Sequence, residues 1–93
     1  NYDAAISILE SGGRYKDNDA LQSVLYLKGI SLYDSGDYST AELFFSRAIK
    51  IERFNDIAAK SLYWKGQSQF ELGSYSSAQK SYNDYLNLST QLN

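Results

Sequence analysis

The chain repeats itself about every 37 residues, and this constrains its fold more than any other feature. Residues 25–29 read Leu-Tyr-Leu-Lys-Gly, and residues 62–66 read Leu-Tyr-Trp-Lys-Gly. Residues 35–41 align with residues 72–78 at the same displacement, and share glycine, tyrosine, serine and alanine at matching positions. A third, partial copy opens the chain at residues 2–6. Repeats of this length are typical of stacked supersecondary units, in which each unit buries its apolar face against the next.

Each copy contains two segments with helical periodicity. In the middle copy the apolar or small positions are Leu21, Leu25, Gly29 and Leu32, and then Ala41, Phe45, Ala48 and Ile49. The whole pattern predicts an all-α chain of about five helices, near residues 3–11, 19–35, 39–53, 56–72 and 76–90. The short break at Gly36-Asp37 predicts an antiparallel helical hairpin. We expect one domain with a half repeat at 1–18 and repeats at 19–55 and 56–93.

Several residues are predicted to begin or end these helices. Capping boxes are expected at Ser39 and Ser76, because each precedes an acidic or amide residue by three positions. The other expected caps are Asn18 or Asp19, Asn55, and a stop at Gly12-Gly13.

Gly29 and Gly66 stand in helix interiors, where glycine costs about 1 kcal/mol relative to alanine. Such a cost predicts a close helix crossing at each glycine. We expect the small residues Ala41 and Ala78 to face these glycines, with Tyr38 and Tyr75 filling the space near the turns.

The recurring residues resemble the tetratricopeptide repeat. The middle copy matches the family pattern at Gly29, Tyr33, Gly36, Tyr38, Ala41, Phe45 and Ala48, and the last copy at Gly66, Phe70, Gly73, Tyr75, Ala78 and Tyr82. The resemblance covers nearly the whole chain. It implies a right-handed stack of antiparallel helical hairpins that binds protein partners.

The chain departs from the family pattern in a few places. Lys28 and Lys65 replace the usual leucine, Gln69 replaces an apolar residue, and the period exceeds the usual 34 residues. Lengthened repeats of this kind resemble those of bacterial envelope proteins, including Tol–Pal-associated periplasmic proteins and outer-membrane assembly lipoproteins. This narrower resemblance favours the bacterial envelope or periplasm over the cytoplasm. Because the chain opens in mid-pattern, we expect it to be a piece of a longer protein.

The resemblance also places a partner-binding surface. In this family the first helix of each hairpin lines the concave face, which here carries Tyr26, Ile30, Tyr33, Lys60, Tyr63, Trp64, Gln67 and Phe70, with Ser23 and Leu27 beside them. The trios 26–30–33 and 63–67–70 each form one helical stripe. These stripes predict an aromatic groove for an amphipathic helix or an extended peptide.

Two other interpretations of these residues stay open. The aromatic side chains could belong to the core, Tyr33 and Phe70 more than Tyr26 and Tyr63, and Trp64 could lie in the seam between hairpins rather than anchor a partner. The basic clamp with which some family members hold a terminal carboxylate is not expected, because Lys60 is the only basic residue at the matching positions.

Composition argues against other functions. The net charge is −2 without a Lys/Arg cluster, so no nucleic-acid partner is expected. No apolar run approaches the roughly 20 residues of a membrane span, so no membrane insertion is expected. The chain has no His and no Cys, so we expect no enzyme activity, no cofactor and no metal.

The main alternative to a peptide-binding scaffold is self-association, or a spacer segment in a larger repeat array. The first predicted helix lacks its hairpin mate, so Ile6 and Leu9 are expected to lie exposed. A second copy of the chain could cover them and form a homodimer.

Overall fold

The structure, a computed structural model, describes residues 1–12, 17–51 and 53–92. It contains α1 (Tyr2–Glu10), α2 (Asn18–Asp34), α3 (Tyr38–Lys50), α4 (Asn55–Glu71) and α5 (Tyr75–Gln91), and no strand occurs among the described residues. The all-α prediction is confirmed, and the helix bounds agree within about one residue except at the end of α3. The first helix ends at Glu10 with Ser11 as its C-cap, directly before Gly12 of the predicted stop. Gly13 lies outside the described residues.

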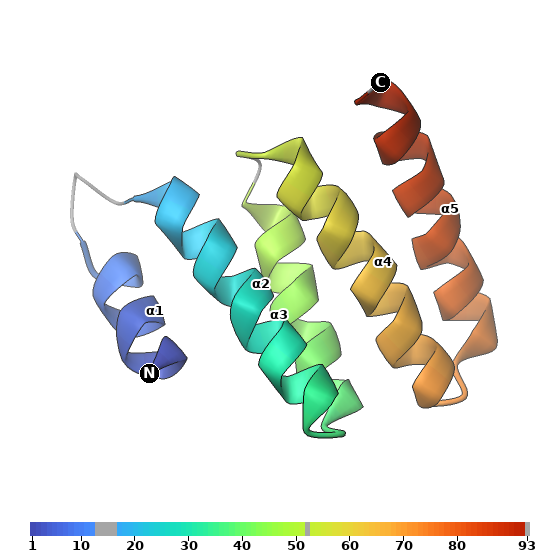
Figure 1. The fold of residues 1–93 in the computed structure, drawn as a ribbon, viewed down its shortest axis with the longest axis horizontal. Helices are drawn as coiled ribbons and strands as arrows, with labels where there is room; N and C mark the ends of the chain where they lie inside the picture. The colour runs from blue at the N-terminus through green and yellow to red at the C-terminus, as the bar shows by residue number, and fades with distance from the viewer. Residues whose placement is uncertain (13–16, 52, 93) are drawn as a thin grey trace.

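The helices stack in chain order (Figure 1). α2 pairs with α3 and α4 pairs with α5 as antiparallel hairpins, while α1 packs on α2 and α3 packs on α4. α2 and α4 also touch each other, and in Figure 1 they lie in front of α3. The two hairpins therefore present α2 and α4 side by side on one surface.

The two hairpin turns have the same construction. Gly36 and Gly73 adopt positive φ angles of 86° and 80°, which glycine tolerates without a steric penalty. In the first turn the N–H of Asp37 donates to the carbonyl of Leu32 at 2.9 Å. The same bond recurs in the second turn at 2.8 Å, and the N–H groups of Gly36 and Gly73 each donate to the carbonyl three residues earlier at 3.0 Å. Both helices therefore end in a Schellman motif.

The predicted N-terminal caps of α2, α3, α4 and α5 were wrong. Asp17 and Asp37 cap α2 and α3, with carboxylates that accept from the N–H groups of Ala20 and Thr40 at 3.0 and 3.4 Å. Phe54 and Ser74 precede α4 and α5 without a side-chain cap. In each hairpin turn a single residue separates the glycine from the next helix. That residue, Asp37 or Ser74, therefore takes the N-cap position. The residues predicted as caps, Asn18, Asp19, Ser39, Asn55 and Ser76, all lie inside helices.

The prediction that Ile6 and Leu9 lie exposed was also wrong. Ile6 is 5% exposed in a core cluster with Leu21, Leu25 and Ala48, and Leu9 packs against that cluster. Two ion pairs fasten the same helix, Asp3 with Lys28 at 3.6 Å and Glu10 with Arg47 at 2.8 Å. Ile6 and Leu9 therefore do not form the exposed apolar face on which the homodimer expectation rested, whereas Ile8 of the same helix is 69% exposed.

Both mid-helix glycines lie where two helices approach closely, as predicted. A Cβ atom on Gly29 would come 2.6 Å from the Phe45 ring, and one on Gly66 would come 2.7 Å from the Tyr82 ring. The nearest facing residues are thus aromatic rings rather than the predicted Ala41 and Ala78. Each missing side chain makes room for a ring of the partner helix.

A fully buried glutamine, Gln22, joins α2 to the connection between α3 and α4. The Gln22 amide nitrogen donates to the carbonyl oxygens of Ala48, Ile51 and Phe54 at 3.2, 2.8 and 3.3 Å. Its amide oxygen accepts from the Phe54 N–H at 2.9 Å. Gln22 therefore provides hydrogen-bond partners for backbone groups at the end of α3 and at the start of α4. α3 itself ends at Lys50, three residues before its predicted end.

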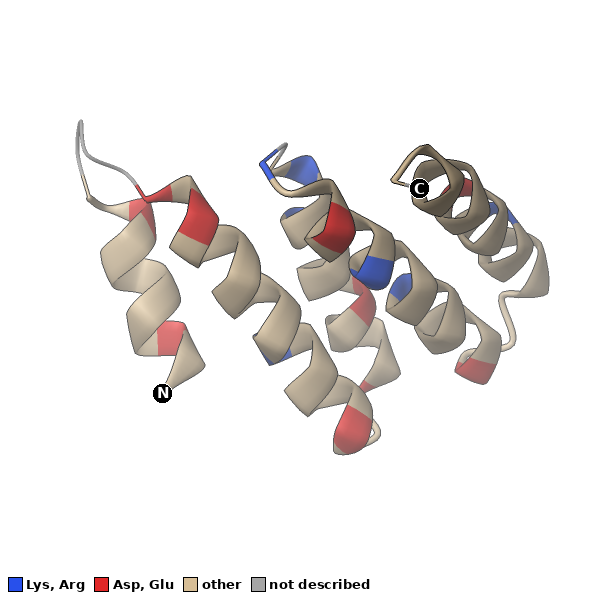
Figure 2. Ribbon diagram, turned by 45° about the horizontal axis from the view of Figure 1, so that its top comes forward, with Lys and Arg blue, Asp and Glu red and all other residues tan. Residues whose placement is uncertain are grey.

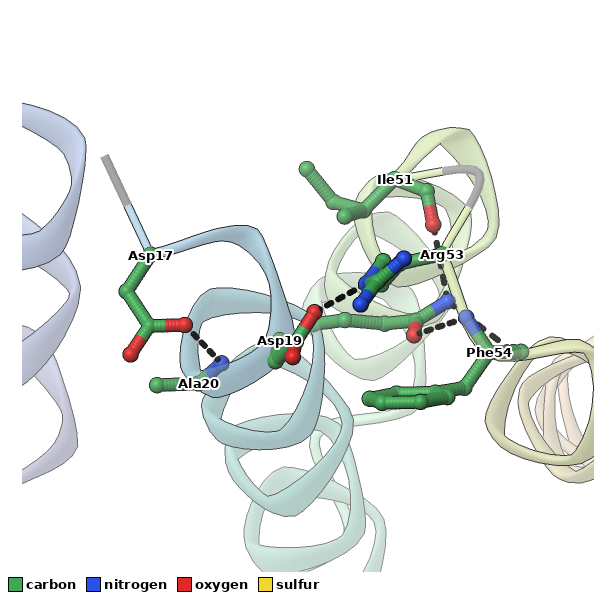
Figure 3. A network of polar contacts seen from close by, with 7 residues as sticks. Asp17, Asp19, Ala20, Ile51, Arg53 and Phe54 are labelled. Carbon is green, nitrogen blue, oxygen red and sulfur yellow. Dashed lines mark hydrogen bonds and ion pairs between the residues drawn. The ribbon is translucent and has the colours of Figure 1, made fainter. Parts of the chain in front are cut away.

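An ion pair lies beside this connection. Arg53 pairs with Asp19 of α2, and the Arg53 guanidinium lies 5.3 Å from the centre of the Phe54 ring (Figure 3). Both charged side chains are about half exposed, so water screens the pair and we expect it to add little to the stability of the fold.

A second buried polar group joins the two hairpins. The Gln69 amide nitrogen donates to the Glu42 carboxylate at 2.7 Å, and its oxygen accepts from the Ser81 hydroxyl at 2.6 Å. Glu42, the acidic residue of the capping box predicted at Ser39, is half-buried and bonds to α4 instead of capping α3. Gln69 therefore replaces an apolar residue without leaving a buried polar atom unpaired.

Candidate functional site

The candidate site is the surface formed by α2 and α4, which we call the α2–α4 face. Both helices are continuous across the predicted stripes, so Tyr26, Ile30 and Tyr33 share one side of α2. Tyr63, Gln67 and Phe70 share one side of α4 in the same way, with Lys60 one turn earlier.

A chain of edge-to-face aromatic contacts crosses this face. The Tyr33 and Trp64 ring centres are 5.1 Å apart, Trp64 and Tyr63 are 5.2 Å apart, and Tyr63 and Tyr85 are 5.5 Å apart. Trp64 is half-buried, and its contact with Tyr33 joins the first hairpin to the second. The tryptophan thus lies in the seam between hairpins, one of the two positions expected for it.

Three members of this aromatic series were not predicted as site residues. Tyr38 packs on Tyr33 at 5.1 Å, and Tyr82 and Tyr85 of α5 both pack on Tyr63. Tyr85 occupies the position that Ala48 holds one repeat earlier. That exchange of a small residue for an aromatic was the available signal.

The predicted site residues differ in how far they reach solvent. On α4, Phe70 is 51% exposed and Tyr63 is 36% exposed. On α2, Leu27 is 43% exposed. Lys60 is also exposed, while Tyr26, Ile30, Tyr33, Trp64 and Gln67 are half-buried. Phe70 is therefore a surface residue rather than a core residue, and none of the eight is fully buried.

Two of the half-buried residues also hold the fold together. The Tyr26 ring lies 6.0 Å from Phe45 of α3, and Gln67 accepts a hydrogen bond from the Tyr82 hydroxyl. Phe70 lies apart from the main aromatic series and packs on Tyr75 at 5.2 Å. The structure thus brings Tyr33, Trp64 and Tyr63 into direct contact and leaves Phe70 at one end.

Acidic residues lie at the ends of these two helices (Figure 2). Asp19 and Asp34 flank α2, and Asp56 and Glu71 flank α4. Between them the predicted site carries one charge, that of Lys60. Apart from Lys60 and Gln67, the residues of the predicted site are aromatic or aliphatic.

Three tyrosines in this region ionise less readily than usual. Burial raises the pKa of Tyr26, and a hydrogen bond with Trp64 opposes part of that rise. Burial, and then the nearby Glu71 carboxylate, raises the pKa of Tyr33. Burial, and then Tyr63 and Glu71, raises the pKa of Tyr82.

These shifts predict an alkaline loss of stability. A tyrosine whose folded-state pKa is raised stabilises the fold fully below the ordinary value of about 10 and loses that contribution as the pH rises through the folded-state pKa. Urea unfolding between pH 8 and 11.5 should show falling stability above pH 10. Tyr33→Phe should flatten part of this fall. An unchanged pH profile in Tyr33→Phe would contradict the assignment.

Comparison with known protein families matches the tetratricopeptide repeat at residues 22–55 and again at residues 59–91. The chain belongs to the tetratricopeptide repeat family. The two matched segments correspond to the α2–α3 and α4–α5 hairpins. No curated protein and no solved structure gives a significant match.

Tetratricopeptide repeats generally mediate protein–protein interactions and are not catalytic. Membership therefore places this chain among proteins that bind other proteins. In the described residues no group of three or more His, Cys, Asp or Glu side chains could hold a metal ion. None of the described helices is long and apolar enough to cross a membrane.

Proposed function

We propose that the α2–α4 face binds a peptide or helix of a partner protein through hydrophobic anchors. The face corresponds to the concave, partner-binding side of tetratricopeptide repeats. The repeats of the chain would act as one domain, with a half repeat at residues 1–18 and full repeats at 19–55 and 56–93.

The observation that carries this proposal is the solvent-exposed apolar area on α2 and α4. Leu27, Tyr63 and Phe70 are all more than a third exposed and lie on the two helices that touch each other. Exposed aromatic and aliphatic side chains on neighbouring helices are typical of protein-binding surfaces. The half-buried Tyr33 and Trp64 rings fix the position of the two helices, because Tyr33 packs on Tyr38 of its own hairpin and on Trp64 of the other.

A selection from a displayed peptide library tests the proposal. Selected peptides should carry apolar anchors at helical or alternating spacing, and Leu27→Glu and Phe70→Ala should each weaken their binding about tenfold. Leu43→Glu is the matched control, because Leu43 is 63% exposed on α3 and lies outside the face. Equal binding by the wild type and both face variants would refute the proposed site.

A further inference from the structure

The internal repeat shows one pair of contacting residues that is apolar in the first hairpin and polar in the second. Ile30 and Phe45 correspond, 37 residues later, to Gln67 and Tyr82. The Tyr82 hydroxyl donates a hydrogen bond to the Gln67 amide oxygen. Packing of the hairpin does not require this bond, because the first hairpin is built with apolar side chains at both positions.

The added hydroxyl leaves the packing of the ring unchanged. The Tyr26 and Phe45 ring centres are 6.0 Å apart with planes tilted by 52°, and those of Tyr63 and Tyr82 are 6.1 Å apart with the same tilt. Phe45 is fully buried, whereas Tyr82 is half-buried. Tyr82 therefore places an oxygen atom beside Gln67 of the α2–α4 face, where a phenylalanine would end in carbon.

Glu71 adds a negative charge to this polar pair. It lies one helical turn after Gln67 on α4 and is exposed. Burial is the main cause of the raised pKa of Tyr33 and of Tyr82, and the Glu71 charge adds to the rise in both. The carboxylate therefore lies near one phenol from each hairpin. We call the group formed by Tyr33, Gln67, Glu71 and Tyr82 the Glu71 site.

The exposure of Glu71 does not depend on where the chain ends. Asp34 is its equivalent in the first hairpin, and it stays exposed although α4 packs beside α2. The ion pairs among the described residues use other carboxylates, and neither α2 nor α4 has a basic residue in its last turn. The carbonyl ends of both helices add to the negative potential. This end of the α2–α4 face is therefore negative (Figure 2).

The Glu71 site offers hydrogen-bond acceptors to a ligand. A carboxylate can only accept, and the Tyr82 hydroxyl already uses its single proton in the bond to Gln67. A group that meets Glu71 and Tyr82 together must therefore donate, and the negative charge favours a cation. The described part of the chain has no pocket, so the group must lie across the surface. The planar guanidinium of arginine, with five N–H donors, fits these requirements.

Both arginines that the structure describes are held between a carboxylate and an aromatic ring. Arg47 pairs with Glu10 and lies 5.0 Å from the centre of the Phe44 ring. Arg53 combines a carboxylate and a phenylalanine ring in the same way (Figure 3). Rings attract a guanidinium through their negative faces. The Glu71 site has the same combination of groups, and no arginine occupies it among the described residues.

We propose that the segment bound by the α2–α4 face carries an arginine that occupies the Glu71 site. Its guanidinium pairs with Glu71, donates to the Tyr82 oxygen and lies beside the Tyr33 ring. The inference rests on the proposed function and adds a charged specificity to its apolar anchors. Because the site lies at the hairpin-turn end of the face, the arginine also fixes the direction in which the segment binds.

Peptides selected from the displayed library are the probe, measured by fluorescence anisotropy. They should carry an arginine at a fixed spacing from the apolar anchors, and Glu71→Gln should weaken their binding about tenfold. Replacing that arginine with citrulline, which has a similar shape and no charge, should weaken binding by the same factor. The two changes together should weaken it little more than either alone.

Three further variants separate this contact from general effects. Tyr82→Phe should weaken binding about threefold, and it should keep the fold because phenylalanine fills this position in the first hairpin. Tyr85→Phe removes another hydroxyl from the aromatic series, and Asp56→Asn removes a carboxylate from the opposite end of α4. Both of these controls should leave binding within about twofold of the wild type.

Four results would each overturn the proposal. They are selected peptides without a common arginine, binding that Glu71→Gln leaves unchanged, an equal loss in Asp56→Asn, and equal binding after the arginine is replaced with lysine. In each of these cases peptides still bind, so the proposed function stands while the Glu71 site fails. If no peptide is selected at all, the proposed function itself fails, and this inference fails with it.

Discussion

Replacing Gln22 with leucine should lower the free energy of unfolding by about 2–4 kcal/mol. Leucine has a similar volume but can neither donate nor accept a hydrogen bond. The substitution leaves the Phe54 N–H without its acceptor, and an unsatisfied buried polar group costs about 1–3 kcal/mol. The Ile51 carbonyl keeps the Arg53 N–H as a donor, so there the substitution costs only a lost hydrogen bond, about 0.5–1.5 kcal/mol. For a chain of this length, each kcal/mol lowers the melting temperature by roughly 4–8 °C.

Urea and thermal unfolding followed by circular dichroism measure this effect. Gln79→Leu is the matched control, because Gln79 is exposed and the same substitution there should change stability by less than about 0.5 kcal/mol. Gln22→Glu separates the two halves of the amide, since it keeps the acceptor for Phe54 but loses the donor to the carbonyls. Equal stability of Gln22→Leu and Gln79→Leu would show that the network contributes nothing.

Gly29→Ala should destabilise the chain by about 2 kcal/mol, whereas Gly66→Ala should be close to neutral. A Cβ on Gly29 would meet the Phe45 ring, which is fully buried and cannot move aside. Overpacking of this kind costs about 1–3 kcal/mol, and we expect the upper end here, less about 1 kcal/mol from the better helix propensity of alanine. The Tyr82 ring facing Gly66 is only half-buried, so it can move aside more easily than Phe45, and the better helix propensity of alanine offsets the strain on its hydrogen bond with Gln67.

The double variant Gly29→Ala with Phe45→Leu tests the cause of this difference. Leucine leaves room for the added methyl group, so alanine at position 29 should then be neutral or mildly stabilising relative to Phe45→Leu alone. A double-mutant cycle by urea unfolding measures the coupling. If Gly29→Ala costs the same in both backgrounds, the clash with Phe45 is not the cause.

The repeat made most of the fold predictable. Residues spaced 37 apart carry the same roles, so Gly36 and Gly73 identified the turns and the apolar periodicity identified five helices. The caps were harder, because Asp17 and Asp37 compete with Asn18 and Ser39 one or two residues away. Such a choice depends on the turn geometry, which composition at neighbouring positions does not reveal.

The polar contacts could not be predicted for a different reason. Gln22 bonds to groups 26 to 32 residues away, and Gln69 bonds to Glu42 across 27 residues. Nothing in a glutamine's local sequence says which distant carbonyls or carboxylates it will meet. The α2–α4 face was predicted as two stripes, yet its aromatic series also includes Tyr38, Tyr82 and Tyr85, which only the helix packing brings there.

The network around Gln22 has a consequence for the order of folding. The turns at Gly36 and Gly73 close bonds between residues five apart, so each hairpin can form its own turn locally. The connection from α3 to α4 is bonded to α2, so it becomes ordered only after the first hairpin has assembled. In hydrogen exchange, the Phe54 amide should then open together with the α2–α3 hairpin and not with its own helix. The second hairpin should therefore pack onto the first only after the first hairpin has folded.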